Sequence, residues 1–99
     1  MLFYGVNGTV LLQWGSGGTS WLCIKSPTQR TPSSNSGGTL NSCNGMLSLD
    51  VLAFLAANPG ALGQPIHAGQ VFHAQTWFRD PPSFKTTNLS DGLTWVLCP

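Results

Sequence analysis

Charge is the property this sequence has least of. Lys and Arg together number four, Asp and Glu number three, and 7% of residues are charged, against about 25% in an average soluble domain. With a net charge of +1 and no basic cluster, the sequence has no electrostatic footprint for nucleic acid or for an anionic membrane surface. No Glu is present at all, which argues against a long helix or coiled coil.

Long apolar runs and metal-type cysteine spacings are also missing. The longest apolar run falls far short of the ~20 residues that cross a bilayer, so no membrane span is expected. The chain has no CxxC pair, and its histidines lie away from its cysteines, which argues against a zinc site. Met1–Tyr4 leads directly into a turn instead of a basic and then apolar leader, so we expect the numbering to begin inside a mature, processed chain.

What the sequence does contain points to a β-rich domain. Hydrophobic residues make up 41% of the chain, enough for a core, and 12 Gly and 7 Pro supply turns. Short apolar segments bounded by turn residues predict one all-β domain over residues 1–99, an immunoglobulin-like or jelly-roll-like β-sandwich of about six to eight strands. The clearest expected strands are Leu2–Val6, Thr9–Trp14, Ser20–Ile24, Gln70–Arg79 and Leu93–Cys98.

Two local predictions concern the ends of these strands. Asn7-Gly8 is a strong hairpin signal and predicts that the first two strands pair with each other. The run Val10–Leu12 lacks alternation, which is typical of a strand covered on both faces.

Residues 47–57 are ambiguous. Leu47, Leu49 and Val51 begin an alternation that favours a strand. A helix instead collects Val51, Leu55 and Ala56 on one face, and Asn58-Pro59-Gly60 would end it. We expect a strand, with room for a helical turn near Ala53–Ala57, and a helix is the alternative.

The cysteines divide into a pair and one left over. Cys23 and Cys43 flank a polar segment, and a disulfide between them would tether an irregular loop over residues 25–41. Closing a loop of about 20 residues is worth roughly 3 kcal/mol in the chain-entropy model. Two buried free thiols are the alternative. Cys98 is unpaired and suggests a partner in another subunit or upstream. Asn7 and Asn88 each begin a triplet of the N-glycosylation type.

Residues with catalytic or metal-binding chemistry are few and scattered. His67 and His73 lack an obvious third metal ligand. Asp80, Asn88 and Asp91 supply oxygen ligands but match no defined calcium loop. Nothing separates the three aspartates into an acid and a base, and Ser16 has no nucleophile motif around it. We therefore expect no enzyme activity, no metal and no cofactor.

Aromatic side chains are the other candidates for binding. Four tryptophans and two phenylalanines could stack on sugar rings, although large aromatics on alternating strand positions are more often core or interface residues. Arg79 is expected to pair with the adjacent Asp80 and to pack its stem on a tryptophan. The aromatic residues in question are Trp14, Trp21, Trp77, Trp95, Phe72 and Phe78.

Two motifs resemble a known module. Trp77-Phe78-Arg79-Asp80-Pro81 and Asn88-Leu89-Ser90-Asp91-Gly92-Leu93 resemble the C-terminal part of a β-domain that recurs in large secreted proteins of environmental bacteria. Leu2-Phe3-Tyr4-Gly5, Leu22-Cys23, Ser42–Gly45 and Leu47–Asp50 look like the middle of the same module. The resemblance covers nearly the whole chain and implies an extracellular β-module, but no catalytic activity.

The chain departs from that module at its start. Such modules have further strands before the Leu-Phe-Tyr-Gly position, and a sandwich without them leaves a groove with unpaired backbone groups. A strand donated by another copy would fill it and, repeated head to tail, would give a filament. The alternative is that these residues are part of a longer chain whose upstream strands complete the domain.

The function expected from the sequence is therefore a non-catalytic, extracellular structural module. It would assemble with copies of itself, through strand candidates that include Leu2, Phe3, Tyr4, Val10, Leu12, Trp95 and Leu97. The alternative is a carbohydrate-binding or adhesive module of a larger secreted protein, which would make glycans its partners.

Overall fold

The computed structural model describes residues 1–39, 42, 44–83 and 85–98. The described chain is mostly β, with seven strands in two antiparallel sheets, one short helix and no closed barrel. The elements are β1 (Leu2–Gly5), β2 (Thr9–Gln13), β3 (Trp21–Ile24), β4 (Gln29–Arg30), α1 (Val51–Ala57), β5 (Val71–Arg79), β6 (Thr87–Leu89) and β7 (Leu93–Val96).

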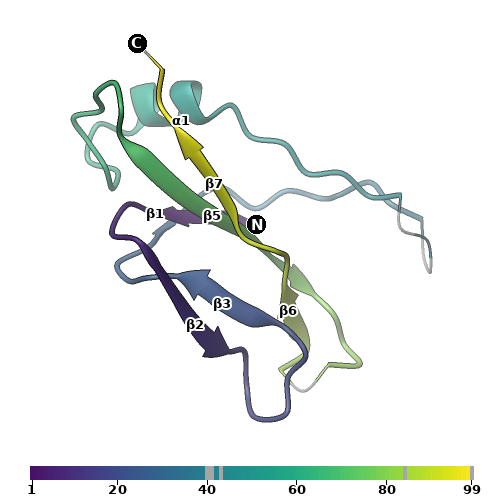
Figure 1. Cartoon of the computed structure of the whole chain (residues 1–99). Coiled ribbons are helices and arrows are strands. Elements are labelled where there is room, and N and C mark those ends of the chain that lie inside the picture. The colour runs from purple at the N-terminus through teal and green to yellow at the C-terminus, as the bar shows by residue number, and fades with distance from the viewer. Residues whose placement is uncertain (40–41, 43, 84, 99) are drawn as a thin grey trace.

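The main sheet is organised around β5, its longest strand (Figure 1). β1 pairs with one edge of β5, through Phe3↔Gln75 and Tyr4↔Ala74, and β4 continues the sheet beyond β1. The other edge of β5 is shared, because β7 pairs with its first half and β6 with its last three residues. This strand is the run of Val, Phe, Trp and Thr that the sequence predicts most clearly.

The second sheet is the hairpin of β2 and β3, which lies over one face of the main sheet. Alternation along β1 sends Phe3 toward this hairpin, where it packs with Ile24 and Leu89. Tyr4 points to the opposite face and packs with Leu55 and the other core residues there, Ala61, Phe72 and Ala74. The main sheet is therefore covered by the hairpin on one face and by α1 with its following turn on the other.

The prediction that the strands on either side of Asn7-Gly8 pair as a hairpin is wrong. Both edges of β1 are already occupied by β4 and β5, so β2 has no place beside it and pairs with β3 instead. The turn, with Gly8 at φ +95°, carries the chain from the main sheet to the hairpin. Gly5 allows the end of β1 to lie close to the end of β3, because a Cβ at Gly5 would lie 2.8 Å from Ile24 Cγ2.

The expected strand over residues 47–57 is also wrong, and the helical alternative is correct. Val51–Ala57 forms α1, and Asp50 caps it by accepting a hydrogen bond from Ala53 N at 3.0 Å. Leu55 is buried in the core, whereas Leu47 and Leu49 lie in the extended segment before the helix. The helix prevails because its periodicity places Val51, Phe54 and Leu55 on one face against the sheet.

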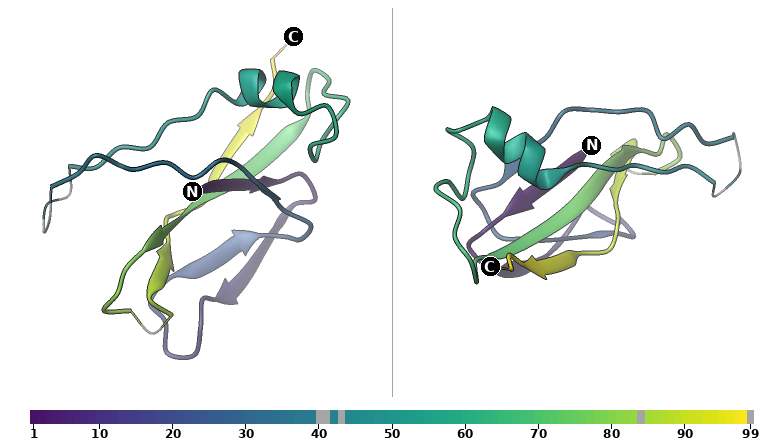
Figure 2. Two further views of the ribbon diagram at one scale, coloured as in Figure 1. Left: turned by 180° about the vertical axis from the view of Figure 1, so that it is seen from behind. Right: turned by 90° about the horizontal axis from the view of Figure 1, so that it is seen from above.

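The polar segment after β3 is not wholly irregular. Gln29–Arg30 forms β4, so the expected loop over residues 25–41 contains a strand. Beyond it, residues 32–39 lead away from both sheets, and residues 44–49 return toward α1 (Figures 1 and 2). We call these two stretches the arm.

The only tyrosine of the chain gives a first prediction. Tyr4 is fully buried, its hydroxyl donates to Leu62 O at 2.8 Å, and burial raises the pKa of its phenol. A raised pKa in the folded state means that Tyr4 stabilises the fold below its ordinary pKa, about 10, and loses that contribution as the pH rises. We expect phenolate absorbance to appear only together with unfolding above about pH 10. Ionisation at the ordinary pKa with the fold intact would contradict this.

Candidate functional site

The histidines and aspartates named by the sequence do not form a reactive cluster. His73 Nδ1 lies 2.8 Å from Thr94 Oγ1, an ordinary contact between β5 and β7, and His67 is exposed in the turn before β5. Among the described residues, no three His, Cys, Asp or Glu side chains are placed to hold a metal ion. Ser16 is exposed in the turn between β2 and β3.

Asp80 and Asn88 do come together, but in a structural role. Asn88 Nδ2 donates to Asp80 Oδ2 at 2.9 Å, and Asn88 Oδ1 accepts from the Ser20 hydroxyl. Asp91 is exposed in the connection between β6 and β7. The amide of Asn88 is thus engaged at both atoms inside β6, whereas Asn7 is exposed in its turn and accessible to a sugar.

The tryptophans are spread over the hairpin and the main sheet. Trp14 donates its indole N–H to Thr87 Oγ1 at 3.2 Å, and Lys85 Nζ covers its ring at 4.1 Å from the centroid. Trp95 stacks on Phe72 with ring centroids 5.4 Å apart. Trp21 is about half exposed, at 46%. Lys85 and Phe72 thus each cover a ring face of Trp14 and Trp95, which leaves less open aromatic surface on which a sugar could stack.

The cysteines show no bridge among the described residues. Cys23 is half-buried on β3, where its thiol contacts Trp21 O at 3.6 Å, and Cys98 is exposed. Cys43 lies outside the described residues, so the Cys23–Cys43 disulfide stays a prediction.

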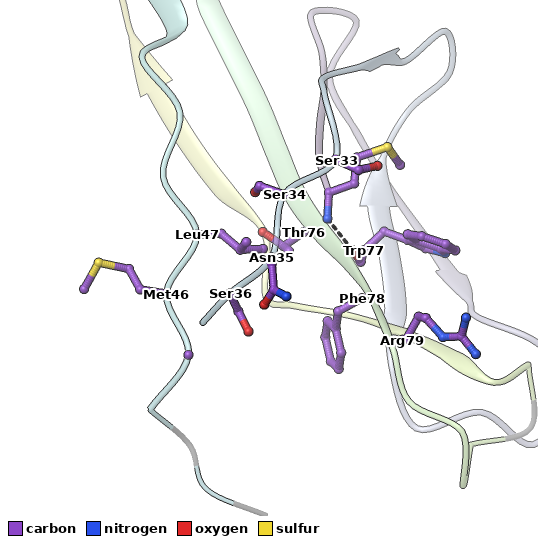
Figure 3. A pocket seen from close by; sticks show the side chains of 12 residues that line it. Ser33, Ser34, Asn35, Ser36, Met46, Leu47, Thr76, Trp77, Phe78 and Arg79 are labelled. Atoms are coloured by element: carbon purple, nitrogen blue, oxygen red, sulfur yellow. Dashed lines mark hydrogen bonds between the residues drawn. The ribbon is translucent and has the colours of Figure 1, made fainter. Parts of the chain in front are cut away.

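An open groove of about 1100 Å³ lies beside Met1 (Figure 3). One wall is the end of β5, Thr76–Arg79, and the other is the root of the arm, Ser33–Ser36 and Gly45–Leu47. Met1 closes the groove at one end, because Met1 N donates to Trp77 O at 2.7 Å and Met1 O accepts from Trp77 N at 2.8 Å. A smaller hollow of about 410 Å³ shares Met1 and Trp77 with the groove and is also lined by Arg30 and by the hairpin residues Trp14 and Leu22.

The groove continues the line of β1, but only for a short distance. Past Trp77, only Phe78 and Arg79 remain before β5 ends at Asp80-Pro81-Pro82. At about 3.3 Å per residue, a strand lying there would pair over two or three residues. Arg79 is the one titratable side chain that lines the groove among the residues that the structure describes, and these supply no acid and base pair for general acid–base catalysis.

The outer edge of β2 is a longer surface for strand pairing. β2 pairs only with β3 among the described residues, and Leu11 and Leu12 are 69% and 53% exposed. Trp14 N donates to Ser20 O across the hairpin, so the N–H and C=O of the preceding Gln13 point outward. The expectation that this strand is covered on both faces is therefore wrong. Residues 9–24 contain no charged side chain to oppose pairing.

The outer edge of β3 is closed by one side chain, that of Gln75. Its Nε2 donates to Trp21 O and its Oε1 accepts from Cys23 N, both at 2.8 Å. Nε2 also donates to Ser90 O at 2.8 Å, and the residue is only 2% exposed. Gln75 thus acts as a short substitute for a neighbouring strand, which leaves β2 as the open edge of the hairpin.

The strand candidates named from the sequence differ in whether they lie on a strand with a free edge. Leu2, Phe3 and Tyr4 lie in β1, which has neighbours on both sides and no free edge. Val10 and Leu12 lie in β2, and Trp95 lies in β7, whose outer edge is unpaired among the described residues and exposes Leu93 and Val96. Leu97 follows β7 and is partly buried against the core. Leu11, Gln13 and Gln75 were missed, because only strand order shows which edges are free.

Comparison with known proteins adds no identification: no family model, no curated protein and no solved structure matches this chain. Among the described residues, no helix has the length and apolar character needed to cross a membrane.

Proposed function

We propose that this chain is a non-catalytic structural module that assembles with copies of itself by β-strand complementation. The observation that carries the proposal is the outer edge of β2, which is unpaired among the described residues, and the strand itself is uncharged and carries two exposed leucines. Such an edge pairs readily with another strand unless charge, proline or cover prevents it. Burying one leucine side chain contributes about 1.5–3 kcal/mol, so both leucines supply a substantial driving force.

Several features support an extracellular setting and a passive role. A net charge near zero favours association over colloidal repulsion, and the described residues that line the groove beside Met1 supply no acid and base pair. The two sheets suit an immunoglobulin-like or jelly-roll-like sandwich, incomplete at the edge of β2, within the secreted β-module that the sequence resembles. A carbohydrate-binding role has less support, because Lys85 covers Trp14 and Trp95 stacks inward on Phe72.

The test is a lysine placed on the open edge. Leu12→Lys is expected to abolish assembly, because pairing would bury a charge that is solvated in the monomer. Leu52→Lys is the matched control, since Leu52 is 59% exposed on α1, and it should assemble like the unmodified chain. Sedimentation velocity and negative-stain imaging report the difference. Equal assembly by both variants would exclude the edge of β2 as the contact.

A further inference from the structure

Among the described residues, most backbone groups of the arm have no hydrogen-bond partner within the chain. Its two stretches are joined by a backbone hydrogen bond from Met46 N to Ser36 O, at 2.9 Å, and by Asn44 Oδ1, which accepts from Thr39 N at 2.8 Å. The side chain of Met46 is 77% exposed. Since Met46 N points to the other stretch of the arm, the N–H of Leu47 points away from it in an extended chain.

Neither the arm nor the β2–β3 hairpin carries a charged side chain. Residues 31–49, like residues 9–24, contain no charged side chain, so nothing repels one from the other. The arm offers an extended stretch of six residues, Asn44–Leu49, and β2 is five residues long. The register of β2 shifts between Thr9 and Leu12, so a regular ladder would run along the Leu12–Gln13 end of the strand, with the exposed side chain of Met46 available to cover a leucine of β2.

A chain does not present its arm to its own β2. The arm and β2 extend toward different sides of the body in Figures 1 and 2, and the longest dimension of the molecule is 41 Å. The returning stretch, residues 44–49, therefore lies away from β2 of its own chain, although Gly45–Leu47 also line the groove.

We propose that the arm of one copy pairs along the outer edge of β2 of the next copy. The inference rests on the proposed self-assembly and names the donor strand, Asn44–Leu49. Because donor and acceptor are different surfaces of the same chain, the contact is heterologous, and its repetition gives an open filament instead of a closed dimer. Main-chain pairing supplies the ladder, and the apolar side chains supply the register.

The experiment mixes two variants that each lack one half of the contact. Leu47→Pro removes the outward N–H of the arm and leaves β2 intact, whereas Leu12→Lys blocks β2 and leaves the arm intact. Each variant alone should sediment as a monomer, and their mixture should give a 1:1 heterodimer that grows no further. Ser34→Pro, on the other stretch of the arm, should assemble like the unmodified chain. Thermal unfolding of each variant checks that the body is folded.

The outcomes separate this inference from the proposed function. Assembly by Leu47→Pro alone, or a mixture that stays monomeric while the unmodified chain assembles, would overturn the arm as donor and leave self-assembly standing. Failure of the unmodified chain to assemble would overturn both. Loss of assembly in Val96→Lys but not in Leu12→Lys would place the acceptor at β7 and overturn this pairing.

Discussion

Replacing Gln75 with Met is expected to lower the free energy of unfolding by about 3–5 kcal/mol. The side chain makes hydrogen bonds to Trp21 O, Cys23 N and Ser90 O, and it joins β5 to the hairpin. Methionine fills a similar volume but cannot replace any of these bonds. Each bond contributes about 0.5–1.5 kcal/mol net, and a buried backbone group left unpaired costs about 1–3 kcal/mol more.

The matched control is Gln13→Met. Gln13 is exposed and its amide makes one hydrogen bond, to Gly18 O at 2.8 Å, so its replacement should cost less than about 1 kcal/mol. Urea unfolding followed by tryptophan fluorescence measures both variants. Equal losses at the two positions would show that Gln75 does not hold the hairpin to the main sheet.

The second large effect is expected at Phe72. Its side chain is fully buried, and its ring lies 5.4 Å from the rings of both Tyr4 and Trp95, measured between centroids. Phe72→Ala removes these contacts and leaves a cavity between β5 and α1, which should cost about 3–5 kcal/mol. Phe78 lies on the same face of β5 but is 41% exposed, so Phe78→Ala should cost a small fraction of that. Calorimetric unfolding of both variants compares the losses, and a small loss at Phe72 would contradict this core.

Much of the strand content could be predicted from local patterns. More than half of the residues of β5 are β-branched or aromatic, and Asp80-Pro81-Pro82 marks its end. The partners of the strands could not be predicted in this way. Asn7-Gly8 predicts a turn, but whether the turn joins neighbours within a sheet depends on β4 and β5, which pair with both edges of β1.

The open edge of β2 and the closed edge of β3 were harder to predict, because they too depend on which strands are neighbours. Alternation places Gln75 and His73 on one face of β5, but it does not show that Gln75 reaches the backbone of β3, 52 residues away in sequence. The run Val10–Leu12 suggests a covered strand because it is apolar, whereas the structure leaves its outer edge open. A sequence pattern reports the apolar character of a strand, while the strand order of the sheets decides which edges stay free.

The central claim is that the outer edge of β2 receives a strand from another molecule. Amide hydrogen exchange at Gln13 tests it most directly, because this N–H points outward and pairing with a donor strand would protect it. We expect exchange at Gln13 to be fast in a dilute monomer and in Leu12→Lys, and slow in the concentrated, assembled chain. Fast exchange at Gln13 in material shown by sedimentation to be assembled would contradict the claim.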